Sequence, residues 1–134
     1  MKRLIQTVVK NFYQLAVKDF MIGYHFRKIQ ELPSKEVLYP ELEAFSQHIP
    51  RITKFWEIQL LGANQDQERP YNLISTHGYL KIRKGELKRF SLLFIETINK
   101  ERLNNPENSD ILDTWIKKIK SFENNFLSSK IIFP

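Results

Sequence analysis

The spacing of the apolar side chains is the feature that most limits what this chain can fold into. In four segments the apolar residues recur every three or four positions, which is the period of an α-helix with one buried face. These segments are Leu4–Asp19, Glu41–Leu61, Gly85–Leu103 and Ile111–Ser128. No segment alternates apolar and polar residues for long, and the 134 residues include only 4 glycines but 10 phenylalanines. The sequence therefore predicts an all-α fold and a single domain over residues 1–134.

Proline and glycine mark the limits of the second predicted helix. Pro50 lies inside its apolar pattern, and Gly62 follows its last apolar residues. Proline is tolerated near the start of a helix, where the backbone N–H groups lack helical partners, so Pro50 predicts a kink or a seam at that point. We expect Gly62 to end the helix, because glycine adopts the left-handed conformation that follows many helices. Further along, "NNPENSD" predicts a turn, with Ser109 or Asp110 as the N-cap of the last helix.

The composition excludes several classes of function. There are no cysteines, which rules out disulfides, iron–sulfur clusters, thiolate zinc sites and a cysteine nucleophile. No stretch approaches about 18 uninterrupted apolar residues, and Lys10, Asn11 and Gln14 interrupt the N-terminal apolar run, so we expect a cytoplasmic protein with no membrane span. The net charge is +6, but basic and acidic residues are mixed, as in "KIRKGELKR". This mixing argues against nucleic acid as the partner.

The three histidines are the remaining candidates for chemistry. His25 lies at a corner between aromatic residues and is predicted at the surface or its boundary. His48 lies in the second predicted helix, and His77 lies in about two helical turns predicted for "YNLISTHGYL". Each is on or beside an apolar stripe and fits either a core histidine with satisfied hydrogen bonds or a ligand. Zinc would lack its other ligands, and no glycine-flanked nucleophile supports a hydrolase. Haem binding is the chemistry that needs one strong histidine ligand in a pocket rich in phenylalanine.

Four motifs resemble those of truncated haemoglobins of the third group, and together they span most of the chain. "NFYQLAVKDFMIGYHF" is similar to the opening motif, with Tyr13 at the distal tyrosine and Phe26 at the phenylalanine that packs on the haem. "HIPRITKFWEIQLLG" resembles the distal helix, with His48 at the distal histidine and Trp56 at a family tryptophan. "HGYL" is similar to the proximal segment, which puts His77 at the iron ligand. "FSLLFIETI" resembles the helix that follows.

The resemblance implies a truncated globin-like two-over-two helical sandwich that holds haem b and binds oxygen, nitric oxide or carbon monoxide. It also implies an electron-donating reductase as a partner, and it leaves open an enzymatic activity of the nitric oxide dioxygenase or peroxidase type. Tyr13 would donate a hydrogen bond to the gas ligand. His48 would gate the pocket, add a hydrogen bond or ligate the iron. The implied contacts of the haem are Phe26, Ile52, Phe55, Tyr71, Phe90 and Phe94.

The sequence also departs from the family pattern. Phe90 stands where the third group usually has tryptophan, which removes an indole N–H donor from the implied distal side. The usual Gly-x-Pro run before the proximal histidine is not kept, and Pro50 just after the distal histidine is unusual. Three residues could pair with the haem propionates or could simply be solvated, namely Arg51, Tyr71 and Arg83. The alternative function is a haem-free helical binding module whose basic surface meets an anionic partner.

Overall fold

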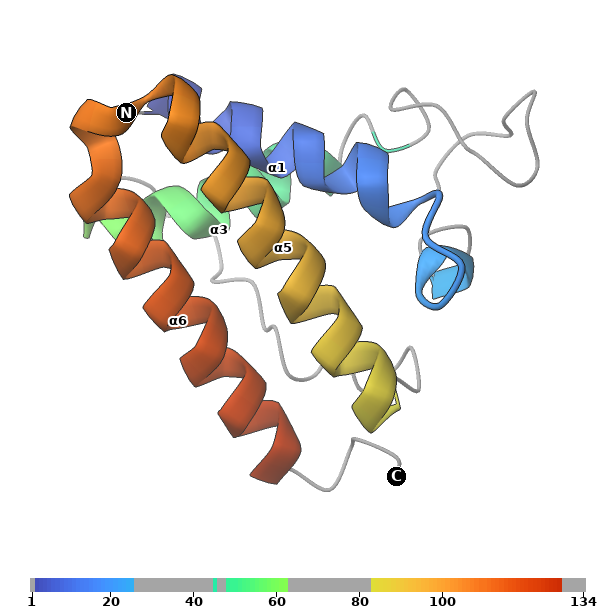
Figure 1. The fold of residues 1–134 in the computed structure, drawn as a ribbon. Helices are drawn as coiled ribbons and strands as arrows, with labels where there is room; N and C mark the ends of the chain where they lie inside the picture. The colour runs from blue at the N-terminus through green and yellow to red at the C-terminus, as the bar shows by residue number, and fades with distance from the viewer. Residues whose placement is uncertain (1, 26–44, 46–47, 63–82, 129–134) are drawn as a thin grey trace. The chain divides into compact units, whose positions relative to one another are not determined.

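The structure is a computed structural model that describes residues 2–25, 45, 48–62 and 83–128 (Figure 1). These residues form helices and connecting turns, so the predicted all-α class is confirmed. The elements are α1 (Lys2–Ala16), α3 (His48–Leu61), α5 (Lys84–Asn104), the short 3₁₀ helix η2 (Pro106–Asn108) and α6 (Ser109–Ser128). None of these helices combines the length and the apolar content that a membrane crossing requires.

By its internal contacts the chain divides into two compact units, Met1–Tyr71 and Asn72–Pro134, and each unit is described by itself. The first unit contains α1 and α3, and the second contains α5, η2 and α6. The single domain and the two-over-two sandwich both stay predictions.

In the first unit, α1 packs against α3. The apolar residues of α1 recur at helical spacing, and every one of them that was expected to face inward is buried. The buried stripe consists of Val8, Val9, Phe12, Tyr13, Ala16 and Val17. The helix ends three residues before the predicted Asp19, so that the carboxylate is left outside it.

The corner after α1 is held by the side chain of Asp19. Its Oδ2 accepts hydrogen bonds from the backbone N–H groups of Met21, at 3.0 Å, and Ile22, at 3.1 Å. This turn buries Ile22 and leaves the preceding Phe20 outside. His25 is also buried, with its ring centroid 4.1 Å from that of Tyr24, so its predicted surface or boundary position is wrong. The corner is too short to show a helical period, and its sequence therefore gave no signal for the side on which His25 lies.

The limits of α3 explain how it accommodates a proline. It begins at His48, whereas Glu41 was predicted and lies outside the described residues. Pro50 is thus in the first turn, where its missing N–H removes no helical hydrogen bond, as expected. At the other end, Gly62 has a φ of 67°, and its N–H donates to the carbonyl of Ile58 at 3.0 Å. The prediction that Gly62 ends this helix is confirmed.

The second unit is an antiparallel pair of long helices, α5 and α6, joined by η2 (Figure 1). The start of α5 is capped by Glu86, whose Oε1 accepts a hydrogen bond of 2.9 Å from the backbone N–H of Arg83. Trp115 is fully buried and lies 5.5 Å from Phe94 between ring centroids, at a tilted angle. This aromatic contact joins the apolar faces of the two helices, which the sequence had placed at helical spacing.

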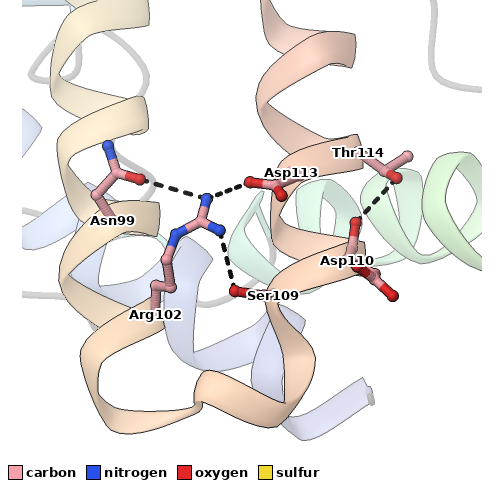
Figure 2. A network of polar contacts seen from close by, with 6 residues as sticks. All are labelled: Asn99, Arg102, Ser109, Asp110, Asp113 and Thr114. Atoms are coloured by element: carbon pink, nitrogen blue, oxygen red, sulfur yellow. Dashed lines mark hydrogen bonds and ion pairs between the residues drawn. The ribbon is translucent and has the colours of Figure 1, made fainter.

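Polar contacts fasten the connection between α5 and α6 (Figure 2). From the end of α5, Arg102 donates to Asp113 at 2.6 Å and to the hydroxyl of Ser109 at 3.1 Å, and a longer contact of 3.4 Å reaches Asn99. The predicted N-cap role of Ser109 or Asp110 is wrong, because Ser109 already has helical backbone angles and is the first residue of α6. Its hydroxyl is engaged by the arginine across the turn, a contact that helix-end patterns do not contain.

We expect Arg102→Ala to lower the free energy of unfolding by about 1 kcal/mol, because it removes an ion pair and a hydrogen bond from a side chain that is 26% exposed. This corresponds to a fall in Tm of about 3–4 °C. Arg102→Lys is the matched control, since a lysine keeps the charge but cannot reach Asp113 and Ser109 with separate nitrogens. Thermal melts followed by circular dichroism measure both variants. A melt of Arg102→Ala that coincides with the parent would show that the network adds nothing to stability.

Candidate functional site

The structure brings together the two residues that the resemblance assigns to the distal side, Tyr13 and His48. Tyr13 comes from the last turn of α1 and His48 is the first residue of α3, and their ring centroids lie 5.7 Å apart. Tyr13 is 4% exposed, whereas His48 is half-buried. The packing of α1 on α3 therefore places a phenol and an imidazole side by side, with the imidazole on the wetter side of the pair.

The ring of Tyr13 is surrounded by aromatic groups from two segments. Phe45 is fully buried and contacts it edge-on at 5.6 Å between centroids, and Phe12 does so at 5.9 Å. Edge-to-face contacts of this kind restrict the orientation of a ring. They leave the phenolic oxygen as the polar end of an otherwise apolar group, and a hydrogen bond made there is stronger than one made in water.

Phe45 is the member of this cluster that sequence analysis missed. The residue lies in the predicted Glu41–Leu61 helix, three positions before His48, and that helical spacing was the available signal. Within its own segment Phe45 is one apolar position among several at helical spacing. Its contact with Tyr13 depends on a second helix, and the sequence of one segment does not specify which side chain of another segment it meets.

The remaining described candidates of the first unit lie in α3. Ile52, one turn after His48, is buried, while Phe55 is half-buried and packs edge-on against Trp56 at 5.1 Å. Residues four and seven positions after a histidine share its helix face, so Ile52 and Phe55 continue the face that carries His48. Arg51, which directly precedes Ile52 and was a possible partner of the haem propionates, is exposed.

Three described candidates belong to the second unit, namely Phe90, Phe94 and Arg83. Phe90 is half-buried and lies 6.0 Å from Phe94, which is fully buried. Because Phe94 also contacts Trp115, it is part of the core of the α5–α6 pair as well as a candidate haem contact. Arg83 is exposed at the start of α5, where its backbone takes part in the cap.

Three predicted residues lie outside the part of the chain that the structure describes. They are the implied iron ligand His77 and the implied haem contacts Phe26 and Tyr71. Their roles stay predictions. Across the described ranges no group of three or more histidine, cysteine, aspartate or glutamate side chains could chelate a metal ion. Haem iron needs only one histidine from the protein on its proximal side, so its binding does not require such a group.

The distal cluster consists of Tyr13, Phe45 and His48, and its chemistry is that of a desolvated hydrogen-bond donor beside an imidazole that water can reach. Such a pair can hold a small polar ligand by hydrogen bonds and move a proton between the ligand and solvent. No protein-family model, no curated protein and no solved structure matches this chain.

Proposed function

We propose that this chain is a haem protein that binds a diatomic gas and has the two-over-two arrangement of truncated haemoglobins of the third group. The observation that carries the proposal is the contact between Tyr13 and His48. Two of the four motifs assign this pair to the distal side of a pocket, and the two rings, which come from separate helices, lie 5.7 Å apart between centroids.

The residues of the distal cluster fit the needs of a gas pocket. A pocket for an uncharged diatomic ligand must be apolar, with very few hydrogen-bond donors placed at one end. Phe45 and Phe12 provide apolar contacts around Tyr13, whose hydroxyl is the donor. The half-buried position of His48 is consistent with a side chain that meets the ligand on one side and solvent on the other.

His77 would hold the iron, and Ile52, Phe55, Phe90 and Phe94 would be wall residues. When bound, a haem would supply the iron that takes a diatomic gas and the one-electron chemistry that an electron-donating reductase would sustain. The protein's own contributions are simpler. Tyr13 would donate a hydrogen bond to the ligand, and His48 would exchange a proton with solvent or close the entrance.

The absorption spectrum of the full chain tests this proposal directly. After addition of one equivalent of haemin and removal of the excess, we expect a Soret band that changes on reduction and changes again with carbon monoxide. A matched sample of a helical protein without a haem site, treated identically, controls for loosely adsorbed haemin. If the chain retains no more haemin than this control, the proposal is wrong, and the haem-free binding module with a basic surface becomes the better description.

A further inference from the structure

The exposed charges along α1 and the first two residues after it are all positive. From residue 2 to residue 18 the chain has four basic residues and no acidic one. All four are exposed, and within the described ranges none of them takes part in an ion pair. This basic face consists of Lys2, Arg3, Lys10 and Lys18. Arg3 and Lys10 lie on the side of α1 opposite the buried stripe, which packs in the first unit, so these charges are directed to solvent.

Three apolar side chains stand at the end of the same surface. Phe20 is 95% exposed, and Leu15 and Met21 are each 37% exposed. The turn that presents Phe20 is held in place, because the Asp19 carboxylate accepts hydrogen bonds from the backbone N–H groups of Met21 and Ile22. These residues form an apolar tip next to Lys18. Exposing a whole phenylalanine to water is unfavourable, and its position beside a basic face indicates a use for it.

We propose that the basic face and the apolar tip dock this protein on the surface of an anionic lipid bilayer. Lysine and arginine next to a negatively charged leaflet are each attracted to it, and a projecting aromatic ring adds binding by entering the boundary between headgroups and acyl chains. A bilayer accepts a protruding phenylalanine anywhere on its surface, whereas a protein partner would need a matching recess. The inference goes beyond the proposed function and does not depend on haem.

Flotation of the full chain with lipid vesicles tests this docking. We expect binding to vesicles of phosphatidylglycerol mixed with phosphatidylcholine, weaker binding at high salt, and little binding to phosphatidylcholine alone. One cation at an anionic surface is worth about a fivefold change in partition, so Lys10→Gln with Lys18→Gln should weaken binding by about 30-fold. Phe20→Ser should weaken it by about tenfold, because the serine has no ring to insert.

Two control variants make the test specific to this surface. Lys117→Gln with Lys120→Gln removes the same charge from exposed positions of α6, and Leu103→Ser removes a side chain that is 82% exposed in the second unit. Both controls should keep most of the binding. Equal losses in the control and test variants would overturn the proposal, since binding would then follow net charge or general stickiness. Binding to soluble polyglutamate but not to the anionic vesicles would also overturn it and favour an acidic protein partner.

Discussion

His77→Ala is expected to reduce haem retention from near-stoichiometric to almost none, while His48→Ala keeps most of it. A haem b group is not linked covalently to the chain, and the proximal histidine is its strong protein ligand. The resemblance assigns that role to His77. His48 would meet the opposite side of the pocket, where a gas ligand can take its place. Haem content after desalting, measured by the pyridine haemochrome spectrum, gives the result for both variants.

Loss of haem could also arise from misfolding, and two measurements separate these explanations. The far-ultraviolet circular dichroism of His77→Ala should match that of the haem-free parent. Added imidazole should restore a Soret band, because it replaces the missing ligand but could not repair a misfolded chain. Full haem retention by His77→Ala without imidazole would contradict the assignment of the ligand. Loss of haem by His48→Ala alone would reverse the proposed roles.

Tyr13→Phe is expected to speed oxygen dissociation by about ten- to a hundredfold. The hydrogen bond from a phenol to a partly anionic ligand is worth about 1.5–3 kcal/mol, and each 1.4 kcal/mol corresponds to about tenfold. The substitution should keep the ring contacts with Phe45 and with His48, because it removes only the hydroxyl. By the resemblance, Phe90 stands where the third group usually has tryptophan, so few other donors would remain to compensate. Stopped-flow measurement of oxygen release tests the expectation.

The companion variant Phe90→Trp should lower the rate of oxygen dissociation, whereas Tyr13→Phe should raise it. An indole N–H at this position would restore the donor that the third group usually has, and oxygen release should become slower if the larger ring is accommodated. Phe94→Trp would be a poor substitute, because Phe94 is fully buried against Trp115. An oxygen dissociation rate that is unchanged in Tyr13→Phe would make Tyr13 a core residue and exclude the distal role argued above.

The sequence predicted the helices and their buried faces well, for a local physical reason. Helical periodicity and the special backbone properties of proline and glycine are recorded in consecutive residues. The buried stripe of α1, the position of Pro50 in a first helical turn and the ending of α3 at Gly62 were therefore predictable. Boundaries were less accurate at the N-terminal ends. Ser109 forms part of α6 because contacts across the turn, and not the capping preference alone, determine where that helix begins.

Contacts between helices could be predicted only where a known family pattern supplied them. The pairing of Tyr13 with His48 came from such a resemblance, whereas the contact of Tyr13 with Phe45 had no counterpart in either segment alone. The burial of His25 and the exposure of Phe20 were likewise decided by tertiary structure. The period of a helix determines which of its side chains share a face, but the residues that meet across two faces depend on the position at which the helices pack.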